Sequence, residues 1–163
     1  MVIVVCRDDR QLVGLAQTSS ANHGFGGVFK LDTPQGQVPP LGAGEDLFII
    51  AHGAVTDPSQ PGNAMIGNQK AGGYGYNAVD LFARLVKLGI FPQGYRGDVY
   101  ISACYSADWL TTRNDAGFSF IEVFTAQIDS KICGYKGRVY GHRGEVEGEI
   151  PPPGDQSWIR PQV

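Results

Sequence analysis

The run LFIIAHG at residues 47–53 joins five apolar residues to a histidine and a glycine. Its apolar part, 47–51, has the length of a strand and no polar face, which is typical of a strand buried on both sides in a parallel sheet. The runs VIVVC at 2–6 and GDVYISA at 97–103 have the same character. These three runs predict a sheet whose two faces are both covered.

Helical spacing follows two of these strands. Apolar residues recur at intervals of three and four over 79–88, after a candidate N-cap at Asn77 and before a stop at Gly89. A second helix is indicated over 118–128, with Asp115 or Ser119 as its cap, and a fourth strand over 137–140. Strands that alternate with helices predict right-handed crossovers and an α/β fold with a mainly parallel central sheet.

Glycine and proline are frequent, with 23 and 10 residues, and gather in segments that we interpret as connections. Residues 12–40, with short apolar pieces such as 27–29, are expected to add a hairpin or an excursion before the next core element. Residues 56–74 are expected to form a long surface loop beyond the second strand. We expect one α/β domain over 1–144, followed by a proline-rich tail or linker over 145–163.

The composition excludes several classes of protein. The chain has 163 residues, 42% of them hydrophobic, with 13 Lys+Arg against 16 Asp+Glu and a net charge of −3. This balance disfavours nucleic acid as a partner, and the apolar runs are too short to cross a membrane. The first residues lack the positive charge of a conventional signal peptide. We therefore expect a soluble protein, either cytoplasmic or exported by another route.

His52 and Cys104 each follow an apolar strand directly. Ligands of open α/β sheets bind outside the carboxyl ends of the strands, so the fold can bring this imidazole and this thiol together. A cysteine nucleophile needs such a neighbour, because the attacking species is the thiolate and an imidazole stabilises it. The pair predicts a cysteine-based active site.

These strand ends resemble those of a known superfamily. The run LFIIAHG at 47–53, followed by VYISACYS at 99–106, is similar to the histidine-glycine and alanine-cysteine strand ends of the caspase-like cysteine peptidases. That superfamily includes caspases, clostripain, gingipain and the self-cleaving cysteine protease domains of bacterial toxins. The spacing of His and Cys also agrees with the roughly 50 residues found in caspases. The resemblance covers about residues 45–141 and implies a caspase-like three-layer fold, with helices on both sides of the sheet.

The resemblance implies a cysteine endopeptidase with a Cys–His dyad, which hydrolyses a protein or peptide substrate without a metal or other cofactor. Cys104 would be the nucleophile and His52 the catalytic histidine. The backbone N–H groups of Gly53 and Cys104 would bind the developing oxyanion. The glutamine-led, glycine-ended caspase signature is absent around Cys104, so specificity for aspartate does not follow. The activity would be self-processing or activated by an effector.

Further roles are open. The carboxylate that orients His52 would be Asp8 or Asp9 after the first strand, or Asp57 near the histidine in sequence. Asp108, with Trp109 and Asp115, follows the cysteine and would line a substrate pocket. The toxin domains bind an anionic effector through basic residues. The resemblance therefore implies an effector site at a local group of positively charged residues in this chain. That group consists of Lys131, Lys136, Arg138 and Arg143.

The main alternative is a protein-binding module without catalytic activity on the same fold, because fold does not determine function. The competing cysteines are interpreted as structural, since Cys6 lies inside a strand and Cys133 has no obvious base beside it. His142 ends the fourth strand and is a competing candidate for the base.

Overall fold

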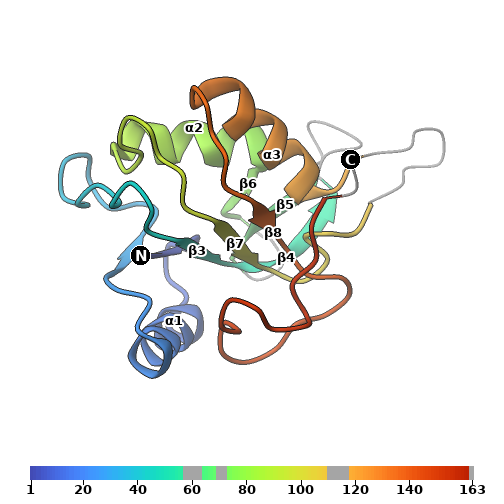
Figure 1. The fold of residues 1–163 in the computed structure, drawn as a ribbon. Coiled ribbons are helices and arrows are strands. Elements are labelled where there is room, and N and C mark those ends of the chain that lie inside the picture. The colour runs from blue at the N-terminus through green and yellow to red at the C-terminus, as the bar shows by residue number, and fades with distance from the viewer. Residues whose placement is uncertain (57–63, 69–72, 110–117, 162–163) are drawn as a thin grey trace.

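The computed structural model describes residues 1–56, 64–68, 73–109 and 118–161. Five parallel strands form the main sheet in the order β2-β1-β3-β7-β8 (Figure 1). The strands are β1 (Val2–Val4), β2 (Val28–Lys30), β3 (Leu47–Ile50), β7 (Val99–Ser102) and β8 (Val139–Tyr140). The predicted α/β class with a parallel sheet is therefore confirmed.

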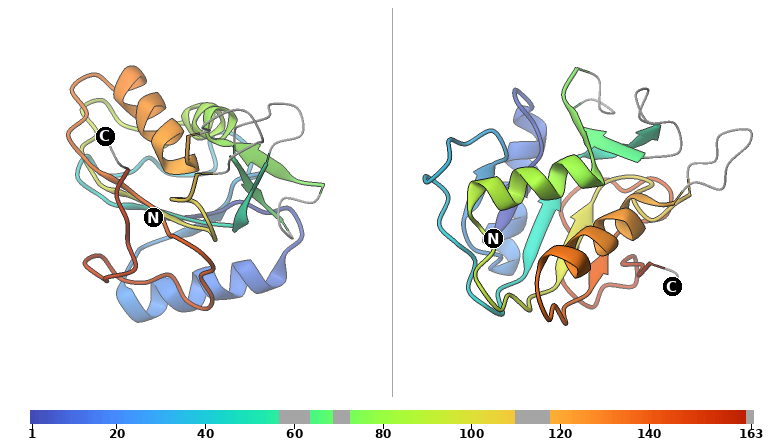
Figure 2. Two further views of the ribbon diagram at one scale, coloured as in Figure 1. Left: turned by 90° about the vertical axis from the view of Figure 1, so that its right-hand side faces the viewer. Right: turned by 90° about the horizontal axis from the view of Figure 1, so that it is seen from above.

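The sheet is covered on both faces. Side chains alternate along each strand, so Ile3 and Ile49 face one core cluster while Val2 and Phe48 face another. Figure 2 shows α2 and α3 on one side of the sheet and α1 with the C-terminal segment on the other. Burial on both faces explains why these strands are continuous apolar runs rather than alternating ones.

The two predicted helices form as expected. α2 (Ala78–Leu88) is capped by Asn77, whose side chain accepts from Asp80 N, and ends at Gly89 with φ of 77°. α3 (Phe120–Lys131) begins with a capping box, which assigns its cap to Ser119 rather than to Asp115. The helices pack together through an edge contact of Phe82 with Phe124.

A third helix, α1 (Arg10–His23), occupies the first part of the segment where we expected a hairpin or an excursion, so that expectation was wrong there. Its buried residues Leu12, Ala16 and Ser19 follow helical spacing, but one of the three is polar and the apolar stripe is short. The expected hairpin near 27–29 was also wrong, because β2 pairs parallel with β1.

A small antiparallel sheet replaces part of the loop expected over 56–74, which corrects that prediction. It consists of β4 (His52–Thr56), β5 (Ala64–Gly67) and β6 (Gly75–Asn77), in that order. Its strands are short and contain glycine, so their sequence has the composition of a turn. Because β4 starts just after β3 ends, this sheet extends from the carboxyl edge of the main sheet.

The C-terminal segment lies against the main sheet on the side of α1. Ile150 is fully buried and its N–H donates to Ser19 Oγ at 2.8 Å. Trp158 packs edge-on against Tyr100, and Gly141 and Ile159 exchange backbone hydrogen bonds. Residues up to 159 therefore contribute to the core around the sheet.

The strand order reverses at one place in the main sheet. The chain leaves β1 toward β2 on one side and later returns to β3 on the other, so β1 and β3 flank a switch point. Ligands of open α/β sheets bind at such points. No helix in the described part of the chain is long and apolar enough to span a bilayer.

Candidate active site

The carboxyl ends of three central strands are level with one another. Val4 pairs with Ile50, and Ile50 pairs with Ser102. His52 and Cys104 therefore each stand two residues beyond a matched pair on adjacent strands. The register carries the two predicted residues to the same edge, beside the switch point.

His52 is oriented by Asp9. Its Nε2 lies 2.8 Å from Asp9 Oδ2, and the two side chains are 32% and 10% exposed. The other carboxylate oxygen, Oδ1, accepts from Leu12 N at 3.1 Å and so caps α1. A carboxylate only accepts hydrogen bonds, so Nε2 carries the proton and Nδ1 of the neutral ring is left as the base. The helix N-terminus also favours the negative charge of Asp9.

Gly53 lies directly against Cys104. A Cβ at residue 53 would lie 2.4 Å from Cys104 Cβ and 3.0 Å from Cys104 O. The next residue, Ala54, donates its N–H to Cys104 O at 2.6 Å. Only glycine fits at this position, because real side chains do not approach that closely. The His–Gly and Ala–Cys strand ends are thus in backbone contact.

The sulfur of Cys104 meets the backbone of Val146. Val146 N–H donates to Sγ at 3.2 Å, and Sγ–H donates to Val146 O at 3.3 Å. Within the described residues, no hydrogen bond joins Sγ to His52. Nucleophile and base are often loosely placed before substrate binds.

The residue after the cysteine has an unusual backbone. Tyr105 has φ of 59°, the left-handed region that non-glycine residues seldom adopt, and its N–H donates to Gly144 O at 2.8 Å. Ser106 is fully buried, where its hydroxyl donates to Ile101 O and accepts from His142 N. Such local strain, held by surrounding hydrogen bonds, is common at functional sites.

The other carboxylates predicted for the site are placed differently. Asp8 is exposed, while Asp57 lies outside the described residues. Asp108 Oδ2 accepts from Gly144 N at 2.6 Å. Asp108 also lines a cavity of about 300 Å³, together with Trp109, Glu122, Arg143, Arg160 and others. Asp108 therefore lines this cavity and also binds Gly144, which is close in sequence to the Val146 backbone at the Cys104 sulfur.

Two of the basic residues predicted to bind an effector line different cavities. Lys131 lies at the end of α3 and lines a groove between α2 and α3. Arg143 lines the cavity beside Asp108 instead. The backbone of Arg138 donates to Asp98 Oδ1 at 2.8 Å, and Lys136 lies in the connection before β8. Within the described residues, no group of three His, Cys, Asp or Glu side chains is placed to hold a metal ion.

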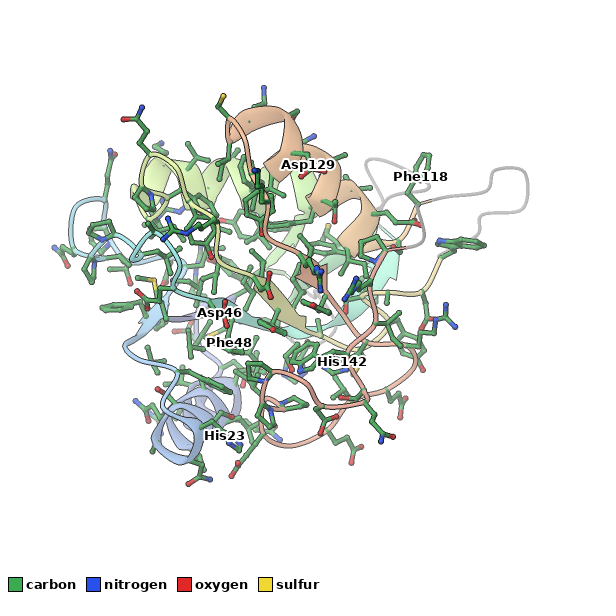
Figure 3. The ribbon with its side chains drawn as sticks, viewed as in Figure 1. His23, Asp46, Phe48, Phe118, Asp129 and His142 are labelled. Atoms are coloured by element: carbon green, nitrogen blue, oxygen red, sulfur yellow. The ribbon has the colours of Figure 1, made fainter. Side chains whose placement is uncertain are left out.

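The competing candidates have structural surroundings. His142 is 2% exposed, packs on Trp158 and contacts Ser157 O through Nδ1 at 3.1 Å. Figure 3 shows it on the side of the sheet that carries the C-terminal segment. Burial lowers the pKa of His142 and raises that of the Cys6 thiol. Cys133 is exposed at the end of the groove between α2 and α3.

Comparison with known proteins does not extend the assignment. No family model, curated protein or solved structure matches the chain. The site is therefore interpreted from its own geometry.

Two residues of the site were not predicted from the sequence. Asn68 Oδ1 accepts from Arg7 N at 3.1 Å, which ties the loop carrying Asp9 to the small sheet. Val146 contacts the sulfur across 42 positions of sequence through its backbone alone. Any side chain could stand at residue 146 with this contact, so the sequence contains no signal for it.

Proposed function

We propose that the protein is a cysteine endopeptidase of the caspase-like type, with Cys104 as nucleophile and His52 as the catalytic histidine. The observation that carries this proposal is the joint geometry of the two strand ends. Gly53 touches Cys104, while the neighbouring His52 is held by a carboxylate at 2.8 Å. A nucleophile, a base and a group that orients the base form the functional unit of many acyl-transfer enzymes.

In the proposed reaction, the Cys104 thiolate attacks the carbonyl carbon of a peptide bond. The oxyanion is stabilised by the backbone N–H groups of Gly53 and Cys104, as in the family that the sequence resembles. His52 then donates a proton to the leaving amine, which frees the new N-terminus. A water molecule, deprotonated by His52, hydrolyses the thioester and restores the thiol.

Asp9 acts on this reaction through His52. Its carboxylate keeps the proton on Nε2 and stabilises the imidazolium that forms when Nδ1 takes a proton. Asp9 is itself fixed because its second oxygen caps α1. The arrangement is a Cys–His dyad with Asp9 as a positioning residue.

Thiol labelling followed at each cysteine tests the proposal. The rate at which iodoacetamide modifies Cys104 at neutral pH should depend on His52, so His52→Ala should lower it and leave the rate of the exposed Cys133 unchanged. Hydrolysis of a denatured protein mixture should be abolished in Cys104→Ala and unchanged in Cys133→Ala. Hydrolysis that persists in Cys104→Ala would reject the proposal.

The second candidate is a protein-binding module without catalytic activity. The contact of Val146 with the sulfur favours it, because that contact occupies the nucleophile. This candidate predicts slow labelling of Cys104 that does not depend on His52, together with no hydrolysis by any variant.

A further inference from the structure

Residues 144–146, here called the strap, run alongside the loop that begins at Cys104. Two hydrogen bonds join them, from Tyr105 N to Gly144 O and from Val146 N to the Cys104 sulfur, and Ala107 N donates to His142 O just before the strap. The two segments thus pair in opposite directions from residue 107 to residue 104. The strap is part of the ordered structure that surrounds the nucleophile.

Two segments of the chain make close contacts with Cys104. Gly53 presses against Cys104 Cβ, and Val146 places both its N–H and its carbonyl within 3.3 Å of Sγ. A peptide carbonyl must come within about 3–3.5 Å of the sulfur before attack. The strap backbone already occupies space at that distance.

The strap also occupies both hydrogen-bonding roles of the Cys104 thiol. A thiol satisfies both groups of Val146, since S–H donates to the carbonyl and sulfur accepts from N–H. A thiolate has no proton to donate and would face the carbonyl oxygen at 3.3 Å with like partial charge. The observed contact therefore engages the thiol as donor and as acceptor at once.

One carboxylate fastens the strap. Asp108 Oδ2 accepts from Gly144 N at 2.6 Å, and a charged acceptor makes a stronger hydrogen bond than a neutral one. Gly144 itself has φ of 64°, a conformation that glycine adopts without strain. Tyr105 OH adds a long contact of 3.5 Å to Glu145.

We propose that the strap is an autoinhibitory contact, fastened by Asp108, and that it must move away from Cys104 before substrate can be attacked. This inference rests on the proposed peptidase function and names its regulation. It also reassigns Asp108, which the sequence placed in a substrate pocket, to holding the strap.

Two variants loosen the strap at different atoms, and each has a matched control. Asp108→Ala removes the acceptor of Gly144 N, while Asp155→Ala removes a carboxylate that accepts from Ser157 N in the C-terminal segment. Gly144→Ala strains a left-handed residue in open space, and Gly154→Ala does the same at φ of 87° away from the site.

The readout is the rate of iodoacetamide labelling at each cysteine, measured by mass spectrometry. Cys133 is exposed and serves as the reference, whereas Cys6 is buried and is labelled only if the variant unfolds. Loss of a charge-assisted hydrogen bond should raise the Cys104 rate about tenfold in Asp108→Ala, with a similar direction in Gly144→Ala. The two controls should stay within about twofold of the wild type.

The outcomes separate this inference from the proposed function. Faster labelling and faster peptide hydrolysis in both strap variants, with Cys6 protected, supports the autoinhibitory strap. Unchanged or slower labelling in both variants overturns it, even where the wild type hydrolyses peptides. Faster labelling without hydrolysis by any variant rejects the peptidase, and the regulatory role of the strap with it.

Discussion

Gly53 and Cys104 are in contact although 51 positions separate them, and a methyl group at Gly53 would lie 2.4 Å from Cys104 Cβ. The resemblance gives this glycine a role in binding the oxyanion through its N–H. The structure adds a steric reason for glycine here, since a side chain would collide with the nucleophile residue itself. The same glycine thereby sets the spacing of the two strand ends.

Gly53→Ala should destabilise the fold by about 1–3 kcal/mol, because the overpacked methyl group forces β4 and the Cys104 loop apart. Urea unfolding followed by circular dichroism measures the effect. Gly14→Ala is the matched control, since Gly14 lies inside α1 with nothing within 4 Å, and alanine there should stabilise by about 0.5–1 kcal/mol. Equal stability of Gly53→Ala and wild type would contradict the close approach.

Asp9→Asn should separate the two roles of Asp9. Asparagine caps helices as well as aspartate does, so stability should change little, whereas Asp9→Ala should lose about 1 kcal/mol. In Asp9→Asn the side-chain NH2 group faces Nε2 and donates to it, which moves the ring proton to Nδ1 and removes the base. In Asp9→Ala the partner of Nε2 is lost, so peptide hydrolysis should fall on the order of a hundredfold in both variants.

Ser119→Ala controls for the capping effect alone, because it removes the cap of α3 without touching His52. It should lose about 1 kcal/mol and keep its hydrolytic rate. Full hydrolysis by Asp9→Asn would show that His52 needs no carboxylate partner.

The central strands were predictable because burial on both faces leaves an unbroken apolar run, which few other structures require. The run at 47–51 and its partner at 97–103 therefore placed His52 and Cys104 at one edge correctly. The caps Asn77 and Ser119 were predictable for a similar reason, since each satisfies backbone donors at a fixed offset.

Elements that depend on distant partners were not predictable. α1 buries Ser19, whose hydroxyl accepts a hydrogen bond from Ile150 N across 131 positions. The buried face of α1 therefore contains a polar residue, and the sequence lacks the apolar stripe that predicts a helix. The strands β5 and β6 are short and glycine-containing, and their pairing with β4 supplies the stability that their composition lacks.

The orienting carboxylate was only partly predictable. Asp8, Asp9 and Asp57 were all close enough in principle, and the choice of Asp9 depends on its position as the N-cap of a helix that the sequence did not reveal. The contact between the strap and Cys104 could not be predicted from the sequence, because the strap makes it with backbone atoms, which every residue has.

His142 should make the fold sensitive to acid. Burial lowers its pKa below the ordinary 6.5, so the unfolded chain binds a proton there more readily than the folded chain. Stability is then highest above pH 6.5 and falls as the pH drops below it, toward the lowered value. His142→Phe keeps a ring on Trp158 and removes the titration, so its melting temperature should fall less than that of the wild type between pH 7.5 and 5.5. An identical pH dependence in the two proteins would exclude His142 as the cause.

Trp158→Ala should show whether residues 145–161 belong to the folding unit. The indole is 8% exposed, packs against Tyr100 and His142, and donates to Pro152 O at 3.1 Å. Its removal should cost about 3–5 kcal/mol, as expected for a large buried aromatic side chain. Trp109→Ala provides a control with the same chemical change, since Trp109 is 57% exposed and should lose about 0.5 kcal/mol or less. Equal unfolding midpoints for the two variants would mean that the C-terminal segment lies on the sheet without stabilising it.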